Sequence, residues 1–355
     1  MDVGSKTERR VSEEEVYTTP RKGGIMNKLY PPGPRPGAGG RVKNHCRKFW
    51  WCDCLVLIIL VLVIVLPLIF VGLPKKAQKE INASTLEVTN MEVTNPTPDS
   101  VHLKIDNTIR SDSSYHPRIE AFRAGLSLEG QDPFIYINIP EAKSEGETLI
   151  TVEQDVTFES ADRFTAYTKA VISSEELTID LNGKTTIHIS GLPATKVDYN
   201  KKITMKGLNH LSGLNISDVK ILSGQKEILS DGSNMIGTVH IPNPSVMTLD
   251  LGNITMNLGV AGKAIGYSLL PNLVLKPGEN NVPMQARVDQ ATIISMILST
   301  YKNGVLPLEI VGNSSVKGDK HLSYYEEAIK ANTIKLDLDA GPALKAIGIN
   351  VTDHS

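Results

Sequence analysis

One uninterrupted apolar segment, Leu55 to Leu73, most constrains what this chain can fold into. Its 19 residues carry no charge, and Pro74 and two lysines follow. An α-helix rises about 1.5 Å per residue, so such a segment nearly spans a hydrocarbon core of roughly 30 Å, with Trp50 and Trp51 at the depth where aromatic residues gather. A buried core helix would need a protein shell on every side, and a cleaved signal peptide would need a small-residue cleavage site. We therefore predict a transmembrane helix over residues 55–73.

Charge and glycosylation motifs give the predicted helix a direction. The residues before Leu55 include 11 Lys/Arg and 6 Asp/Glu, a net charge of +5. Since the whole chain has a net charge of −2, the rest of the chain carries −7. Positive charge marks the cytosolic side of a membrane helix, whereas Asn-x-Ser/Thr motifs accept N-glycans in the lumen. All five such motifs follow the helix, at Asn82, Asn215, Asn253, Asn313 and Asn350. We predict a single-pass type II protein with a lumenal or extracellular C-terminal region and no nucleic-acid partner.

Residues 1–54 read as a disordered, basic, Pro/Gly-rich cytosolic tail, because this composition cannot bury enough apolar surface to order itself. A passive spacer and a segment that recruits cytosolic proteins both fit, and the composition favours the spacer. The chain's three cysteines, Cys46, Cys52 and Cys54, all lie in this tail. They are candidate palmitoylation sites, or equally unmodified thiols, and their spacing does not match a zinc site.

Beyond the helix the apolar pattern changes to a period of two, which is typical of half-buried strands. Val101, Leu103 and Ile105 alternate with polar residues, and similar runs recur between Gly, Pro and Asn turn signals. Two stretches instead have helical spacing, one capped by Ser160 and one by Asp289. Many short strands with few helices indicate antiparallel sandwiches or barrels.

The strand pattern also repeats along the chain. Asn95-Pro96 ends one early strand and Asn243-Pro244 ends another. The stretch that contains each predicted helix keeps its length, 37 residues from Gly146 to Gly183 and 34 from Gly278 to Gly312, whereas the loop before it is longer in the first copy. The proline fixes φ and removes a donor, which ends a strand, so a turn is a likelier role for these pairs than a ligand rim. The repeat predicts two copies of one domain, at residues 80–225 and 226–355.

These features resemble the late embryogenesis abundant group-2 (water-stress/hypersensitive-response type) domain, and tandem copies behind one helix are similar to fungal membrane-anchored proteins of largely unknown function. The resemblance implies an all-β fold with one amphipathic helix per domain. We expect two tandem antiparallel immunoglobulin/fibronectin-like β-sandwiches after the membrane helix. It further implies an endomembrane location, the vacuolar membrane first and the endoplasmic reticulum or plasma membrane as alternatives.

No catalytic motif, metal-ligand spacing or cofactor signature is present, so we expect a protein that is not an enzyme and needs no cofactor. Gly259 to Ala264 lacks the spacing and the Ser/Thr of a phosphate-binding loop, and Asp337 and Asp339 fit a solvated strand edge. The remaining candidate site is an apolar groove beside the two helices, although the spacing of the same residues favours a core. It would be lined by Phe158, Phe164, Tyr167, Met284, Ile294 and Leu298.

The sequence thus favours a non-catalytic binding or tethering module, with the bilayer as one partner and a lipid as a candidate ligand. The lipid expectation draws on the resemblance as well as on the groove. The alternative is a scaffold or receptor that binds protein through its sandwiches and recruits partners through its cytosolic tail.

Overall fold

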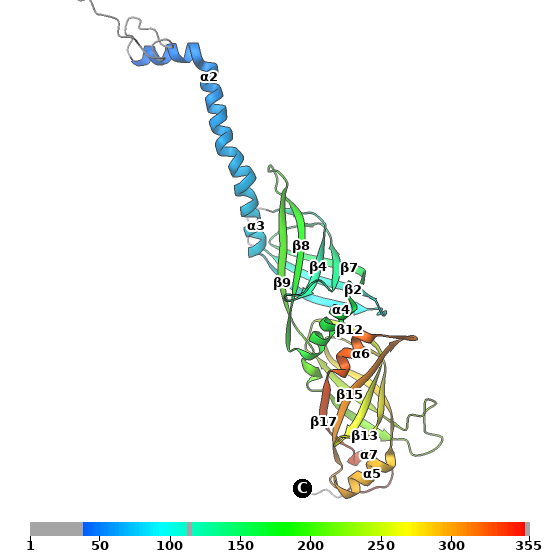
Figure 1. Cartoon of the computed structure of the whole chain (residues 1–355). Coiled ribbons are helices and arrows are strands. Elements are labelled where there is room, and N and C mark those ends of the chain that lie inside the picture. The colour runs from blue at the N-terminus through cyan, green and yellow to red at the C-terminus, as the bar shows by residue number, and fades with distance from the viewer. Residues whose placement is uncertain (1–37, 112–115, 352–355) are drawn as a thin grey trace, which may run out of the picture. The chain divides into compact units, whose positions relative to one another are not determined.

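The computed structural model describes residues 38–111 and 116–351, and for residues 38–48 the backbone only (Figure 1). The chain divides into two compact units, residues 1–66 and 67–355.

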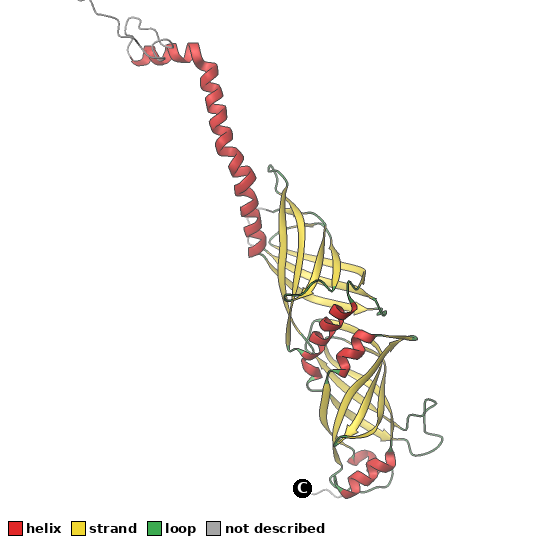
Figure 2. Cartoon of the chain, viewed as in Figure 1, coloured by secondary structure: helices red, strands yellow, loops and turns green. Residues whose placement is uncertain are grey.

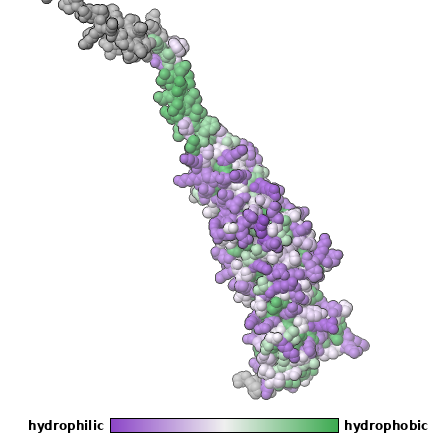
Figure 3. Space-filling view, in the orientation of Figure 1, coloured by the Kyte–Doolittle hydropathy of each residue, from purple (hydrophilic) through white to green (hydrophobic). Residues whose placement is uncertain are grey.

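The first unit contains the long helix α2 (Ala38–Pro67) except for its last residue, Pro67, and this helix includes most of the apolar run. Its described side chains from residue 50 to 66 are nearly all exposed, and a helical stretch long and apolar enough to cross a membrane begins at Phe49. Figure 3 shows hydrophobic residues gathered along this helix. The helix starts well before Leu55, in part of the tail predicted to be disordered, because no proline lies between Pro36 and Pro67 to stop it.

The second unit begins with two further helical elements, the π-helix η1 (Leu68–Gly72) and α3 (Leu73–Ala83). Pro67 lacks an N–H, and the N–H of Leu73 bonds to the Leu68 carbonyl with the wider spacing of a π turn. The helical path therefore continues past the proline and past the predicted end of the segment at Leu73.

Strands dominate the rest of the second unit, with a few helices between them (Figure 2). Within the described residues they form two hydrogen-bonded sheets. The smaller sheet has six strands, β3 (Arg118–Ile119), β4 (Phe122–Leu128), β5 (Ile135–Ile139), β6 (Ala142–Lys143), β8 (Glu176–His188) and β9 (Thr195–Lys206).

The larger sheet has 11 strands and draws on both halves of the unit. From the first half come β1 (Thr85–Thr94), β2 (Ser100–Arg110) and β7 (Glu147–Thr157). From the second half come β10 (Asn215–Ile221), β11 (Met235–Asn243), β12 (Met247–Val260), β13 (Lys263–Leu275), β14 (Gly278–Val288), β15 (Val305–Lys317), β16 (Lys320–His321) and β17 (Thr333–Asp339).

The two halves join through one parallel strand pair, β1 with β12, in which Met91 lies opposite Met247. The other strand pairs between named strands are antiparallel. In the first half, strands from both sheets face a shared apolar interior, whereas β10 to β17 all belong to one sheet. The chain is therefore mainly β. Its division into two tandem sandwich domains, with the boundary between residues 225 and 226, stays a prediction.

Bulges let β12 run unbroken from Met247 to Val260. Gly252 sits at one of them with φ of +69°, and a Cβ at this position would lie 2.5 Å from the Val316 carbonyl oxygen. Only glycine fits both the backbone angle and the close approach of β15.

Helices α4 (Ala161–Ser173) and α5 (Gln290–Ser299) confirm the two predicted helices and their caps. Ser160 accepts the Arg163 N–H, and Asp289 accepts the Thr292 N–H. Further helical turns that the sequence reasoning did not identify are η2 (Asn209–Leu211), α6 (Ser323–Lys330) and α7 (Gly341–Ala346).

Helices α4 and α6 lie side by side where the two halves meet (Figure 1). The Thr168 hydroxyl donates to the Tyr324 carbonyl at 3.0 Å, and the Tyr324 hydroxyl donates to the Thr97 carbonyl at 3.0 Å. The Phe164 and Tyr324 rings pack edge to face with centroids 5.0 Å apart. These contacts tie residues from both halves into one core.

Candidate apolar ligand site

The candidate site starts from α3, whose sequence is amphipathic. Leu73, Ala77 and Ile81 are spaced four residues apart and form one apolar stripe, while the lysines and Glu80 lie between them. Ala77 and Ile81 are each only 6% exposed. The stripe therefore faces protein, and α3 packs against β9.

Gln78 fixes α3 to the edge of β9 through its side-chain amide. Its Nε2 donates to the Asp198 carbonyl at 2.7 Å, and its Oε1 accepts the Asp198 N–H at 2.9 Å. The amide thus pairs with the strand as a neighbouring strand would, because it offers one donor and one acceptor in the same plane. This contact satisfies an edge of β9 that would otherwise be open.

Lys201 fixes the C-terminal end of α3. Its ammonium donates to the carbonyl oxygens of Ile81 and Ser84, where the helix ends and leaves carbonyls without helical partners. A cation is favourable at this end of a helix dipole. The Lys201 side chain is only 8% exposed, and burial lowers the pKa of its ammonium below the usual value.

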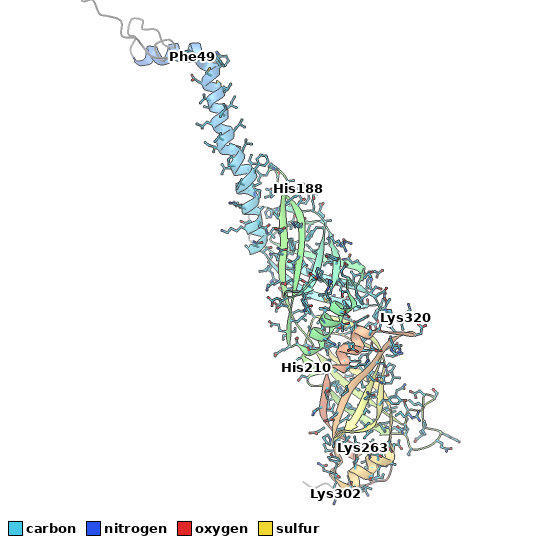
Figure 4. The ribbon with its side chains drawn as sticks, viewed as in Figure 1. Phe49, His188, His210, Lys263, Lys302 and Lys320 are labelled. Atoms are coloured by element: carbon cyan, nitrogen blue, oxygen red, sulfur yellow. The ribbon has the colours of Figure 1, made fainter. Side chains whose placement is uncertain are left out.

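Between α3 and the first-half strands lies a cavity of about 160 Å³. Its walls are mainly apolar, and the polar groups come from Lys76, Glu80 and a few serines. The lining comprises Leu73, Lys76, Ala77, Glu80, Ile81, Ser84, Ile109, Ser111, Pro117, Ile119, Ser144, Ile187, Ile189, Leu192 and Tyr199. Ile187 comes from the end of β8, next to His188, which Figure 4 labels.

The volume sets what this cavity can hold. An engineered apolar cavity of about 150 Å³ stays dry and binds benzene, so the space beside α3 suits roughly six carbon atoms. Burial raises the pKa of Tyr199 to about 12, so its phenol stays neutral at physiological pH. Within the lining, the charged groups are Lys76 and Glu80, both on α3. The cavity can therefore take an uncharged apolar chain whose polar end stays near α3.

The six residues predicted to line a groove do not form one site. Phe158, Phe164 and Tyr167 belong to an aromatic core, in which the Phe158 and Phe164 rings stack with centroids 3.7 Å apart. Met284 and Ile294 line a separate cavity of about 40 Å³ in the second half, closed by α5 and α7. Leu298 is 56% exposed on α5. Sequence spacing identified apolar faces but could not show which of them meet.

The two Asn-Pro pairs occupy different environments. Asn95 is exposed with φ of +47°, and Pro96 is buried. Asn243 is 2% exposed, and Pro244 is exposed. The Asn243 Nδ2 donates to the Met247 carbonyl at 2.8 Å, and its Oδ1 accepts a hydrogen bond from the Ser245 hydroxyl at 2.6 Å. Asn95 directly follows β1, whereas Asn243 is the last residue of β11, and only Asn243 shapes the turn that follows with side-chain hydrogen bonds.

The predicted modification sites are mostly accessible. Four of the glycosylation motifs present an exposed asparagine, at Asn82, Asn215, Asn313 and Asn350. Asn253 is half-buried, and its Oδ1 accepts the Asn272 N–H at 2.9 Å. Of the cysteines, Cys52 and Cys54 are free thiols on α2, whereas the Cys46 side chain lies outside the described residues.

Other polar groups have local structural partners. His102 Nδ1 donates to the Asp155 carboxylate at 2.8 Å, and His188 Nε2 donates to the Glu120 carboxylate at 2.5 Å. The Asp155 hydrogen bond is the main cause of a raised His102 pKa. Among the described residues, no group of three or more His, Cys, Asp or Glu could hold a metal ion.

Two motifs considered for chemistry also have structural roles. The segment Gly259 to Ala264 contains the two-residue hairpin turn between β12 and β13, formed by Ala261 and Gly262 with positive φ. Asp337 and Asp339 are exposed on the same face of β17.

The sequence reasoning missed the cavity beside α3 because its walls come from four distant segments. One signal was available: the four-residue spacing of Leu73, Ala77 and Ile81 continues the apolar run as an amphipathic helix. The partner walls, Ile109 and Tyr199, look like ordinary strand core residues in the sequence.

Comparisons with known proteins add a partial family match. Residues 132–258 match a family described as "Protein of unknown function (DUF3712)". The comparison with curated proteins finds no match. None of these findings links the chain to late embryogenesis abundant domains or to fungi, so that resemblance stays a prediction.

Two solved structures are similar over part of the chain. The periplasmic chaperone SfaE is 10% identical, with 65% of this chain and 93% of that chain covered and a TM-score of 0.17. A bacterial adhesin from Mobiluncus mulieris with intramolecular disulfide, isopeptide and ester bond cross-links is 11% identical, with 65% and 81% covered and a TM-score of 0.18. Scores this low support no statement about fold or function.

Proposed function

We propose that this chain is a membrane-anchored, non-catalytic binding protein that holds the acyl tail of a lipid in the cavity beside α3. One observation carries the proposal. Leu73 is both the last residue of the apolar run and a wall of a mainly apolar cavity of about 160 Å³. A lipid tail that leaves a bilayer needs such an apolar surface, because its exposure to water costs about 0.8 kcal/mol per methylene group.

The cavity's chemistry matches an amphiphile. Its inner walls are aliphatic, from residues such as Ile81, Ile119 and Ile187, while Lys76 and Glu80 supply charge from α3. Space for roughly six carbons admits the end of one chain and excludes two chains together. Gln78 and Lys201 hold the α3 wall in place, so the site is formed before the ligand arrives.

The proposal includes the membrane arrangement. The apolar helix is a type II anchor, the tail of residues 1–54 is cytosolic, and the β-rich region is lumenal with N-glycans at its exposed motifs. The vacuolar membrane is the first compartment to test, followed by the endoplasmic reticulum and the plasma membrane. Residues 80–225 and 226–355 are two copies of one β-sandwich domain, of which the first holds the ligand.

Photolabelling tests the lipid site in the full chain. The protein is reconstituted in nanodiscs that contain a phospholipid with a diazirine at the end of one acyl chain, and labelled peptides are identified by mass spectrometry. We expect label on the cavity walls, in the peptides that carry Ile81 and Ile187. Ala77→Leu adds volume inside the cavity and should reduce this label several-fold.

Ala83→Leu is the matched control, since Ala83 is an exposed residue on the same helix. It should leave the label on the cavity walls unchanged. Label confined to the apolar helix in the wild-type protein would overturn the lipid site and favour the scaffold function, in which the β-rich region binds protein.

A further inference from the structure

We propose that Ile109 and Tyr199 form a constriction at the inner end of the cavity beside α3, and that this constriction sets how deep an acyl chain can enter. The inference rests on the proposed function, because it assumes that this cavity holds an acyl chain. It adds the ligand class: the end of a single unbranched chain, stopped at a defined depth.

The evidence is a second space that shares these two walls. An apolar void of about 30 Å³ lies between the sheets of the first half, and Ile109 and Tyr199 line both this void and the cavity beside α3. They are the two residues common to both linings. Ile109 stands on β2 of the larger sheet and Tyr199 on β9 of the smaller one, so they close the passage from opposite sides.

A third space adjoins the second one. A void of about 10 Å³ shares Met91, Leu126 and Ile179 with the 30 Å³ void, and its lining also contains Phe134 and Tyr167 of the aromatic core. Volumes thus fall from about 160 to 30 to 10 Å³ along the interior. One water molecule needs about 10–15 Å³ of such space and a six-carbon ligand about 150 Å³, so a chain of several carbons fits the first cavity and does not fit the inner ones without movement of the walls.

The constriction is built from well-held side chains. Tyr199 is 3% exposed, and its ring lies 5.2 Å from the Phe122 ring, centroid to centroid. Ile109 is 8% exposed in the middle strand of three, opposite Leu86 on β1 and Thr148 on β7. Close packing on both sides resists displacement, so the chain end should stop there.

The test compares where a chain end lies in different variants. The full chain in nanodiscs is exposed to hexadecanoic acid that carries a diazirine on its terminal carbon, and labelled residues are mapped by mass spectrometry. In the wild-type protein the label should fall on outer walls such as Ile187 and spare Met91. Tyr199→Leu widens the passage and should move label to Met91 and Val152 several-fold above wild type.

Ile109→Ala opens the same passage from the opposite sheet and should produce the same shift, which covers the case in which Tyr199→Leu does not fold. Tyr325→Leu is the matched control, because Tyr325 is 2% exposed and lines none of these three spaces. This variant should keep the wild-type pattern.

Three results would overturn the inference. Label at Met91 in the wild-type protein would show that no constriction exists, and unchanged label in both opening variants would show that these residues do not set the depth. Absence of label from the cavity in folded wild-type protein would overturn the proposed function as well, and so the two failures are distinguishable.

Discussion

The buried cation that holds the end of α3 gives the sharpest test of how the cavity wall is fixed. In Lys201→Met the side chain keeps most of its length and apolar volume but loses its bonds to the carbonyls of Ile81 and Ser84. Ile81 still accepts the N–H and the hydroxyl of Ser84, at 3.2 and 2.8 Å, whereas the Ser84 carbonyl loses its cation.

The magnitude follows from this asymmetry. Leaving the carbonyl of half-buried Ser84 without its charged donor costs about 1–3 kcal/mol, and removing the desolvated ammonium recovers part of that. A net loss of about 2 kcal/mol corresponds to a roughly 30-fold increase in the population of conformations with α3 detached, since about 1.4 kcal/mol is a factor of ten.

Hydrogen exchange of the full chain in nanodiscs measures this population directly. Amides of residues 77–84 should exchange roughly 30-fold faster in Lys201→Met, while strands of the second half keep wild-type rates. Lys206→Met, at an exposed lysine on the same strand, should have no effect. Unchanged exchange at α3 in Lys201→Met would refute the view that this lysine fixes the cavity wall.

Two further predictions concern stability. Gly252→Ala should lower the free energy of unfolding by at least about 2–3 kcal/mol, because φ is +69° and a Cβ there would lie 2.5 Å from the Val316 carbonyl oxygen. Gly262→Ala, at a φ of +75° with nothing within 4 Å, should cost only about 1 kcal/mol, and equal losses in thermal melts would contradict this. The Asp155 hydrogen bond raises the folded-state pKa of His102 above 6.5, so its stabilisation is fully present below pH 6.5 and is lost as the pH rises through the folded-state pKa. The stability difference between wild type and His102→Gln should therefore shrink as the pH rises above 6.5, and a pH-independent difference would refute this assignment.

The sequence predicted local structure well where the cause was local. Ser160 and Asp289 cap helices as expected, because a cap needs only a side-chain oxygen and the next N–H groups. The alternation from Val101 to Ile105 appears as alternate burial along β2. Both signals lie within a few residues of one another.

Local sequence patterns did not predict the longer-range features of the fold. The parallel pairing of Met91 with Met247 joins strands far apart in the chain, and no local pattern specifies which strand edge meets which. The Asn-Pro pairs at Asn95 and Asn243 look similar in the sequence, but Asn95 is exposed and Asn243 is buried. Burial depends on neighbours from other strands, which a local motif does not report.

The sequence predicted the apolar chemistry of the candidate site but not its position in the fold. An apolar ligand space next to a helix was expected at α4 and α5, and a mainly apolar cavity of about 160 Å³ lies beside α3 instead. The aromatic residues at α4 fill their space completely enough to be core, with Phe164 only 2% exposed. Packing at this level depends on side-chain volumes from several strands, which period and composition do not report.

Native mass spectrometry of the full chain tests the central claim most directly. The protein is extracted from its membrane in a mild detergent, and the lipid that stays bound is counted as collision energy removes the micelle. Wild type and Ala83→Leu should each retain one lipid per chain, and Ala77→Leu should retain none. Equal retention in all three proteins, or none in any of them, would contradict a lipid-binding cavity beside α3.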